Sequence, residues 1–254
     1  MKITVITVTF NSAATIADAL RSIAAQTHPD IEHLVIDGGS TDATLALVAE
    51  HGTRVVKVVS EPDHGIYDAM NKGMRLATGE LVGCLNSDDV FATPHVLADV
   101  ARSAAEQGAD AVYGDITYVD PTRADPLVRY WQAGSYSPAK LRLGWMPPHP
   151  SLYVRRAVIE RIGVFDPLLR IAGDYEFMLR LFSLPGLKAA YLPEVLVHMR
   201  VGGASQRSIG ALLLKSREDL QALRRHRLGG IVALVCKNLR KVPMFFARPP
   251  ATRS

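Results

Sequence analysis

Cysteine and long apolar runs are both scarce in this sequence. The 254 residues contain two cysteines, Cys84 and Cys236, which indicates neither a disulfide framework nor a thiolate metal site. No apolar stretch approaches the roughly 20 residues that a membrane-spanning helix needs. Met1 and Lys2 lead directly into an apolar segment, without a leader or a small-residue cleavage site, so we expect no secretion signal. Together these absences favour reduced, cytoplasmic chemistry.

Basic charge is concentrated at one end of the chain. Residues 207–254 hold eleven Lys or Arg side chains and two acids, so this segment carries +9 while the remainder carries −5 of the overall +4. With 48% hydrophobic residues the chain can form one sizeable core. We therefore expect one domain over residues 1–206 and a helical, basic tail over residues 207–254.

Apolar strands alternate with amphipathic helices along the first half. Strands are predicted at Ile3 to Phe10, Ile31 to Ile36, Val55 to Val59, Glu80 to Leu85 and Ala111 to Tyr113. The intervening segments place apolar residues at helical spacing, as Ile16, Leu20 and Ile23 do. Such alternation predicts an α/β fold with a mostly parallel, Rossmann-like sheet flanked by helices. Farther on, Thr117 to Val119 and Val128 to Trp131 are typical of a hairpin.

Two adjacent carboxylates follow the predicted strand Glu80 to Leu85. The run from Asn86 to Asp89 ends in Asp88 and Asp89, and neighbouring acids repel unless a cation lies between them. A hard divalent ion carrying substrate phosphates would meet that need. A solvated turn before the helix near Pro94 is the alternative interpretation.

Three polar loops fall at the carboxyl ends of the first, second and fourth predicted strands. They are Thr9 to Asn11, Asp37 to Asp42 and Asn86 to Asp89. In a doubly wound sheet these ends meet at one rim, where nucleotides bind with their phosphates near loop amides and helix amino termini. The sequence therefore predicts a nucleotide site at this rim.

The ordered motifs of the chain resemble those of family 2 glycosyltransferases. The resemblance extends from about residue 3 to Ser205 and is carried by four segments: Thr7 to Asn11, Asp37 to Asp42, Glu61 to Gly73, and Asn86 to Asp89. It implies an inverting enzyme of the GT-A fold that uses a nucleotide-activated sugar, similar to bacterial enzymes of envelope polysaccharide and glycolipid assembly.

The resemblance also implies roles for single residues on the donor side. Thr9 and Asn11 would border the nucleoside, Asp37 would contact the base and ribose, and Asn86 and Asp88 would face the ribose and diphosphate. Asp89 would hold Mg²⁺ or Mn²⁺.

One departure concerns the base. Many members have two acids before the Gly-Ser, whereas Asp37 is followed here by Gly38. A base-reading carboxylate is therefore missing from this segment, and we expect a UDP- or dTDP-sugar.

Three further residues are predicted to approach the donor. Asp63 precedes the flexible Gly65 and is the better candidate in its segment, while His149 and Arg200 are expected at the diphosphate. Arg200 opens the segment Arg200 to Ser205, which resembles a family loop that closes over the diphosphate. A surface salt bridge is the alternative role for Arg200.

Asp174 is the candidate catalytic base. It begins a segment whose residues Phe177, Met178 and Leu181 form one apolar helix side. The segment resembles the family region whose acid takes the proton from the acceptor hydroxyl, except that Gly173 stands where a Glu usually precedes the Asp. Helix capping alone is the alternative. A second open question is Trp145, for which sugar stacking and ordinary packing are both compatible with the sequence.

The tail is predicted to contain two helical pieces. The first has one apolar side suited to docking on the domain, formed by Ile209, Leu212, Leu213, Leu220 and Leu223. The second combines the apolar run Ile231 to Cys236 with the basic residues Arg240 and Lys241. We favour attachment to a membrane surface over simple packing or an oligomer contact. Nucleic-acid binding ranks lower because no recognised nucleic-acid module accompanies the charge.

These observations predict a metal-dependent inverting glycosyltransferase. The expected partners are a nucleotide-sugar donor and a lipid-linked or glycolipid acceptor at the inner face of the cytoplasmic membrane, in cell-envelope glycan biosynthesis. A metal-dependent nucleotide-sugar hydrolase and a non-catalytic nucleotide-sugar-binding protein are the alternatives. The sequence does not indicate an oligomeric state.

Overall fold

The structure is a computed structural model that describes residues 1–254 except 121, 124–125, 202–208 and 250–254. Its described strands form one mixed sheet with the order β3-β2-β1-β4-β8-β6-β9-β5, and β7 pairs with β6. The strands are β1 (Ile3–Thr9), β2 (Ile31–Asp37), β3 (Val55–Ser60), β4 (Leu81–Cys84), β5 (Val90–Phe91), β6 (Ala111–Val119), β7 (Leu127–Trp131), β8 (Tyr153–Arg155) and β9 (Ala189–Arg200).

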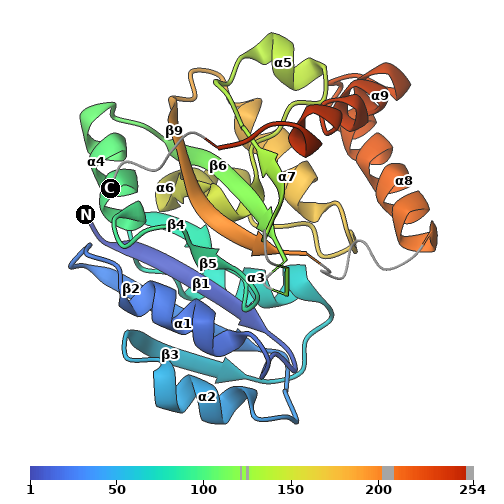
Figure 1. The fold of residues 1–254 in the computed structure, drawn as a ribbon. Helices are drawn as coiled ribbons and strands as arrows, with labels where there is room; N and C mark the ends of the chain where they lie inside the picture. The colour runs from blue at the N-terminus through green and yellow to red at the C-terminus, as the bar shows by residue number, and fades with distance from the viewer. Residues whose placement is uncertain (121, 124–125, 202–208, 250–254) are drawn as a thin grey trace.

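Helices cover both faces of this sheet (Figure 1). The α-helices are α1 (Ile16–Ala24), α2 (Thr44–His51), α3 (Ile66–Leu76), α4 (Val96–Glu106), α5 (Pro138–Arg142), α6 (Arg156–Ile162), α7 (Gly173–Phe182), α8 (Ile209–Arg225) and α9 (Ile231–Leu239). Short 3₁₀ turns occur at η1 (His149–Ser151) and η3 (Val242–Phe245). The α/β class predicted from the sequence is thereby confirmed.

The amino-terminal half of the sheet is parallel. β1 pairs with β2 and β4, and β2 pairs with β3, all in parallel. Every residue of β1 is buried, which fits a central strand covered on both faces. α1 buries one stripe, Ile16, Ala19, Leu20 and Ile23, against the sheet. In this half, the predicted alternation of apolar strands and amphipathic helices therefore corresponds to a central sheet layer covered by helices.

The carboxyl-terminal half of the sheet is mixed. β8 lies antiparallel between β4 and β6, whereas β6 runs parallel to β9. β6 is much longer than the predicted Ala111 to Tyr113, because its far end also forms the expected hairpin with β7. Tyr118 lies in this extension of β6.

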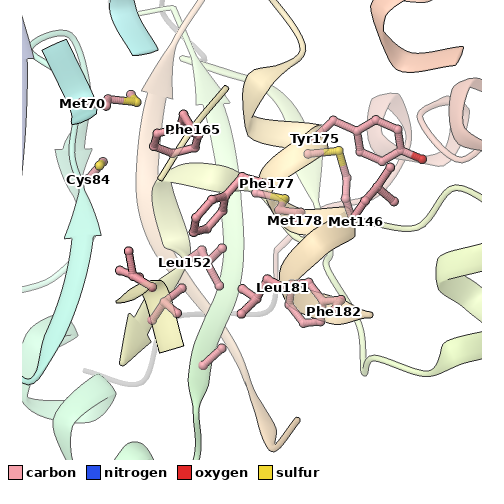
Figure 2. Packing of buried hydrophobic residues seen from close by; sticks show 14 of the residues in the cluster. Met70, Cys84, Met146, Leu152, Phe165, Tyr175, Phe177, Met178, Leu181 and Phe182 are labelled. Atoms are coloured by element: carbon pink, nitrogen blue, oxygen red, sulfur yellow. The ribbon is translucent and has the colours of Figure 1, made fainter. Parts of the chain in front are cut away.

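α7 packs its apolar side against this half of the sheet. Its buried residues include Phe177, Met178, Leu181 and Phe182, which meet residues from α3, β4 and the η1 segment in one apolar cluster (Figure 2). Full burial of a large apolar side chain contributes about 1.5–3 kcal/mol. The cluster therefore fixes the position of α7 against the sheet.

The tail helices α8 and α9 pack beside α7, at the opposite end of the molecule from α2 and β3 (Figure 1). On α8, Ala222 and Leu223 are buried, whereas Leu212 and Leu213 are exposed. Docking of the first tail helix on the domain is thus seen over its second half. Among the described helices, none is both long and apolar enough to cross a bilayer.

Candidate functional site

The parallel strands bring three predicted loops to one rim of the sheet. Thr9 at the end of β1 is in register with Asp37 at the end of β2, and Asp37 is in register with Ser60 of β3. Ser87 Oγ lies 2.9 Å from Ser12 Oγ, which joins the β4 loop to the β1 loop. The structure therefore gathers the three loops as the strand order predicts.

Asp37 is fully buried and holds its own loop in place. Its carboxylate accepts hydrogen bonds from the amides of Gly39 and Ser40 and from the hydroxyls of Ser40 and Ser60. Although burial opposes ionisation, these donors bring its pKa below the ordinary value. The carboxylate is thus engaged within the loop, and its predicted contact with the base and ribose stays a prediction.

Asn11 adopts a left-handed backbone, with φ of 49°, which Asn tolerates better than most residues. Its side-chain Oδ1 accepts the amide of Thr41 at 2.9 Å, and its own amide donates to Ser40 Oγ at 2.8 Å. Asn11 therefore connects the β1 and β2 loops while its side chain remains at the exposed rim.

Asp63 lies directly against Gly38. A Cβ atom at position 38 would collide with the Asp63 carboxylate and would lie 3.4 Å from the ring of Phe10. Asp63, from the loop before α3, therefore occupies the space that a side chain at position 38 would need. Asp63 also accepts the amide of Gly65 at 2.8 Å.

Unsatisfied oxygens mark the ends of β1 and β4. Thr9 Oγ1, Asn86 Oδ1 and Asp89 Oδ1 are buried and lack a hydrogen-bond partner among the described residues. Burial, reinforced by the charge of Asp88, raises the pKa of Asp89 well above its ordinary value. Buried polar groups without partners are rare in folded proteins, so these oxygens indicate a place for a ligand.

A divalent cation fits this donor set. Mg²⁺ and Mn²⁺ prefer oxygen ligands and commonly use one or two carboxylates together with substrate phosphates. Within the described residues no group of three or more His, Cys, Asp or Glu side chains could hold a metal by itself. Asp89, with Asp88 beside it, would therefore share the ion with a diphosphate.

Arg200, at the end of β9, lies next to Asp89. Its charge and its backbone amide both act to stabilise the Asp89 carboxylate against the effect of burial. Its guanidinium pairs with Asp18 of α1, so the salt bridge considered from the sequence is present. Residues 202–205 of the predicted closing loop lie outside the described residues.

Asp174 occupies the first turn of α7. Its Oδ1 accepts the amide of Tyr175 at 2.7 Å and lies 3.4 Å from the hydroxyl of Tyr67, which also donates to Ile171 O at 2.7 Å. A Cβ at Gly173 would lie 2.7 Å from the Tyr67 ring. The aromatic ring of α3 thus occupies the space beside position 173, which explains the glycine there.

Asp174 and Asp89 act on a common neighbour. Burial raises the pKa of Tyr118 to about 12; Arg129 opposes the rise and the charges of Asp89 and Asp174 add to it. Burial lowers the pKa of His149, and Asp174 counteracts this effect. The end of β6 therefore lies within the electrostatic reach of both acids, with His149 near Asp174.

The tail helix α8 fixes the approach to Asp174. The Glu218 carboxylate accepts the backbone amides of Arg170, Ile171 and Ala172 at 3.0, 2.9 and 2.8 Å. Hydrogen bonds to a charged acceptor stabilise by about 1.5–3 kcal/mol. Glu218 thus attaches the segment that precedes α7 to helix α8.

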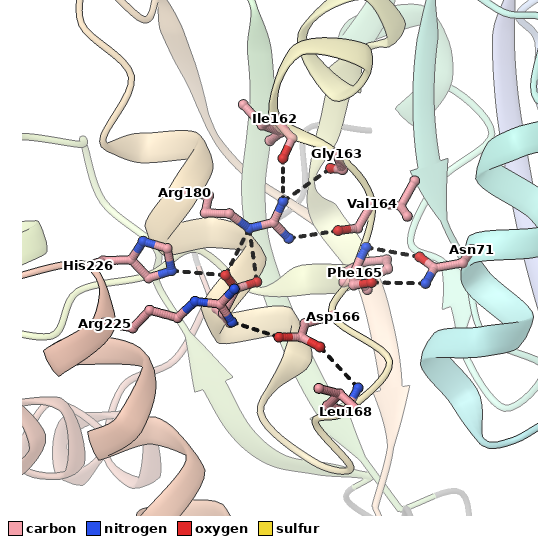
Figure 3. A network of polar contacts seen from close by, with 11 residues as sticks. Asn71, Ile162, Gly163, Val164, Phe165, Asp166, Leu168, Arg180, Arg225 and His226 are labelled. Atoms are coloured by element: carbon pink, nitrogen blue, oxygen red, sulfur yellow. Dashed lines mark hydrogen bonds and ion pairs between the residues drawn. The ribbon is translucent and has the colours of Figure 1, made fainter.

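A second polar contact between α7 and α8 lies one turn farther along (Figure 3). His226 Nε2 lies 2.9 Å from Glu176 Oε1, and the Arg180 guanidinium contacts Glu176 together with the carbonyls of Ile162 and Val164. Arg225 donates to Asp166 at 2.7 Å. The tail is therefore bound to α7 by charged groups as well as by apolar packing.

Sequence reasoning missed Tyr67, Tyr118, Arg129 and Glu218 as members of this site. Tyr67 stands inside the segment Glu61 to Gly73, so that motif was an available signal. Glu218 and its neighbour Asp219 are the acids of a basic tail, which was a second signal. Trp145 is packed: its indole N–H donates to Ala133 O at 2.7 Å, and it contacts Tyr136 and Phe182.

Comparisons with known proteins show which family the chain resembles. The family described as Glycosyl transferase family 2 matches residues 4–157. A PGL/p-HBAD biosynthesis glycosyltransferase of Mycobacterium tuberculosis is 32% identical over 213 residues, covering 82% of this chain and 80% of that protein. An uncharacterized glycosyltransferase of the same species is 33% identical over 180 residues, covering 70% and 68% respectively.

Solved structures share the fold. Staphylococcus aureus TarS 1–349 in complex with UDP-GlcNAc superposes with a TM-score of 0.69 at 21% identity, covering 89% of this chain and 65% of that one. A mannosyltransferase from Pyrobaculum calidifontis in complex with GDP-Man and Mn²⁺ gives 0.67 at 21% identity, covering 94% and 69%. In a longer TarS structure, the match spans 39% of that chain.

Proposed function

Because this chain belongs to glycosyl transferase family 2, we propose that it transfers a sugar, with inversion, from a UDP- or dTDP-sugar to a hydroxyl of a lipid-linked or glycolipid acceptor. That the chain is a glycosyltransferase follows from its family and from named relatives. The donor, the metal and the acceptor are proposals. The observation that carries the donor and metal proposals is the set of buried oxygens of Thr9, Asn86 and Asp89 that lack a hydrogen-bond partner among the described residues.

The donor binds at the rim formed by β1, β2 and β4 in this proposal. Thr9, Asn11 and Asp63 surround the nucleoside side, while Asn86 and Asp88 face the diphosphate. Support comes from the unsatisfied oxygens of Thr9 and Asn86 and from the position of Asp63 over Gly38. TarS has been solved with UDP-GlcNAc, which agrees with a uridine donor.

Asp89 would hold Mg²⁺ or Mn²⁺ at the diphosphate. When bound, the ion offsets charge on the departing nucleoside diphosphate. The buried and unsatisfied Oδ1 of Asp89 supports this role, and the Pyrobaculum mannosyltransferase has been solved with Mn²⁺. Asp174 acts on the pKa of His149, and Arg200 acts on that of Asp89, which supports the proposal that His149 and Arg200 contact the leaving group.

Asp174 would take the proton from the acceptor hydroxyl as that oxygen attacks the anomeric carbon. Its backbone partner Tyr175 and the hydroxyl of Tyr67 orient the carboxylate. The Glu218 contacts hold the preceding segment in place. Inversion is expected because a single base on one side of the ring allows one direct displacement.

A membrane-associated acceptor is supported by the tail surface. Exposed apolar side chains cluster on α9 and η3: Ile231, Val232, Val235, Leu239, Val242, Phe245 and Phe246. Large exposed apolar patches mark interaction sites, and nearby basic residues favour anionic lipid surfaces. The Mycobacterium tuberculosis relative is named for PGL/p-HBAD biosynthesis. We therefore propose peripheral attachment at the inner face of the cytoplasmic membrane.

A panel of nucleotide sugars tests the proposed function. The protein is incubated with each donor and Mn²⁺, with and without a membrane lipid extract, and the products are separated by chromatography. Transfer predicts a glycosylated lipid that forms with only some donors and only when extract is present. Release of free sugar at the same rate without extract would instead identify a hydrolase, and binding without turnover a nucleotide-sugar sensor.

A further inference from the structure

A cavity of about 270 Å³ lies between the β7 hairpin strand, the loop after α5 and the tail. Three basic residues of the tail contribute to its wall: Lys237, Arg240 and Lys241. The facing wall is mainly aromatic and apolar and includes Trp131, Trp145 and Met146, and the tail itself adds Met244. A mixed wall of this kind suits a ligand that joins an anionic group to an apolar one.

The cations of this region outnumber the acids that contact them. Lys237 Nζ lies 2.6 Å from Asp219 Oδ2, and Lys215 Nζ lies 3.4 Å from the same carboxylate. Two ammonium groups therefore share one acid, and Lys241 adds a third positive charge to the cluster. Burying like charges together is unfavourable unless an anion joins them.

Electrostatic effects on the lysines agree with this crowding. Burial lowers the pKa of Lys237 to about 7, with the charge of Lys215 acting in the same direction and Asp219 against it. Burial and the charge of Lys215 also lower the pKa of Lys241. An additional anion would restore the charged form of both groups.

The cluster reaches the candidate base. Lys237 Nζ lies 3.6 Å from the ring centre of Tyr175, the residue that follows Asp174 on α7. Although burial disfavours the charged form of Lys215, the carboxylates of Asp174 and Asp219 raise its pKa above the ordinary value. The cavity wall therefore connects, through Lys237 and Lys215, with the surroundings of Asp174.

The tail residues that line this cavity are neighbours in α9 and η3 of exposed apolar residues. Lys237 and Met244 are buried, whereas Val235, Leu239 and Phe245 in the same two short helices are exposed. Lys237 and Met244 thus lie on the inner side of α9 and η3, Arg240 is exposed at the cavity, and apolar groups cover the outer side. A lipid chain could lie on the outer side while its head group enters the cavity.

We propose that this cavity is an acceptor subsite that binds a phosphate group, held by Lys241, Arg240 and Lys237 next to Asp174. This inference rests on the proposed glycosyltransfer and narrows the acceptor to a phosphate-bearing molecule. Lys and Arg are common phosphate ligands, and hydrogen bonds from them are charge-assisted. The phosphate then anchors the acceptor so that its hydroxyl reaches Asp174.

Intrinsic fluorescence can test the subsite directly, because both tryptophans of the chain line the cavity. The full chain, without nucleotide sugar, is titrated with inorganic phosphate, dihexanoyl phosphatidic acid and dihexanoyl phosphatidylcholine. We expect saturable changes with the first two probes. Tighter binding of phosphatidic acid identifies a lipid phosphate as the natural ligand, and equal binding identifies a free phosphate.

Matched variants assign the signal to the cavity. Lys241→Gln and, at a more exposed position, Arg240→Gln are each expected to raise the Kd for phosphatidic acid about tenfold or more, since each removes a charge-assisted contact. Arg224→Gln, on the exposed side of α8, is the control with the same change of charge. Asp89→Asn should leave the titration unchanged, because it belongs to the donor side. Thermal melts verify that each variant is folded.

Three results would overturn the subsite: no fluorescence change with any phosphate probe, an unchanged Kd in both cavity variants, or preferential binding of phosphatidylcholine. Because no donor is present, these results are independent of sugar transfer. Failure of transfer in the donor panel would contradict the proposed function instead.

Discussion

A substitution at Asp174 can distinguish the proposed catalytic role of this residue from a purely structural one. Asp174→Asn keeps the shape of the side chain and its contact with the Tyr175 amide, but it removes the proton acceptor. We expect kcat to fall by about 10² to 10⁴, with the free energy of unfolding lowered by no more than about 1 kcal/mol. Steady-state kinetics and chemical denaturation measure both quantities.

The same exchange at Asp99, a surface residue of α4 paired with Arg102, is the control and should leave kcat unaltered. Wild-type turnover by the Asp174→Asn protein would rule out the base assignment.

Asp89 provides the second residue-scale prediction. Removal of divalent ions with EDTA is expected to abolish transfer, and added Mn²⁺ should restore it. Asp89→Ala should reproduce the loss without recovery by Mn²⁺, because the buried carboxylate proposed to hold the ion is gone. Activity assays across a metal titration make the comparison, and full activity in chelator would contradict the proposed metal role.

His33 makes stability depend on pH. It is buried on β2, its Nε2 lies 3.0 Å from Thr7 Oγ1, and burial lowers its pKa from 6.5 to about 4. Below pH 6.5 the unfolded chain takes up a proton that the folded chain does not, so stability falls as the pH drops toward 4. The loss approaches about 3 kcal/mol for this group.

Denaturant unfolding at pH 7.5 and pH 4.5 should show that loss in the wild-type protein and a smaller one in His33→Gln. An equal pH dependence in both proteins would assign the effect to other groups.

Among the elements, the contact between α8 and the segment before α7 is the most informative. Glu218→Gln leaves one oxygen to serve three amides. We expect the free energy of unfolding to fall by about 1–3 kcal/mol and kcat to fall more than the donor KM changes, because the segment leads to Asp174. Glu106→Gln, the same exchange at the exposed end of α4, is the control. A lowered stability with wild-type kcat would restrict Glu218 to a structural role.

The elements also show what the sequence could predict. β1, α1, β2 and β4 lie close to their expected positions because each is a continuous apolar or amphipathic segment. No strand was predicted at β9. Its middle holds Pro193, a residue that is uncommon inside strands. The structure accommodates it where the β6–β9 register shifts between Gly114 and Asp115.

Some residues of the candidate site could likewise be predicted from the sequence, and others could not. Motif residues such as Asp89 were found because they are close together in sequence and follow a strand. The contacts of Glu218 with the amides before α7 join positions 46 to 48 residues apart, and no local pattern carries that information. The position of Asp63 against Gly38 could not be predicted for the same reason, because it depends on how two loops meet.

At the scale of the whole molecule, the two ends have different surfaces. The exposed side of the tail is apolar and the segment is basic, so we expect binding to vesicles that contain anionic lipid. Replacing Val232, Val235 and Phe246 by Ser should reduce cosedimentation at least tenfold, since buried apolar area drives interfacial binding. The substituted residues are exposed, so the fold should be retained.

Val56 and Val58 on β3, at the other end of the sheet, are also exposed, and replacing both by Thr is the matched control. Equal sedimentation of the two variants would contradict the membrane proposal.

Glu218 also sets an order of events during synthesis. The amides that it accepts belong to residues 170–172, and Ala172 precedes it by 46 positions. These amides therefore leave the ribosome before Glu218, their hydrogen-bond acceptor, has been synthesised or exposed. Until α8 has been synthesised, the nascent chain can bury its sheet, but the segment before Asp174 lacks its contacts with Glu218. We therefore infer that the surroundings of Asp174 are the last part of the candidate site to fold during translation.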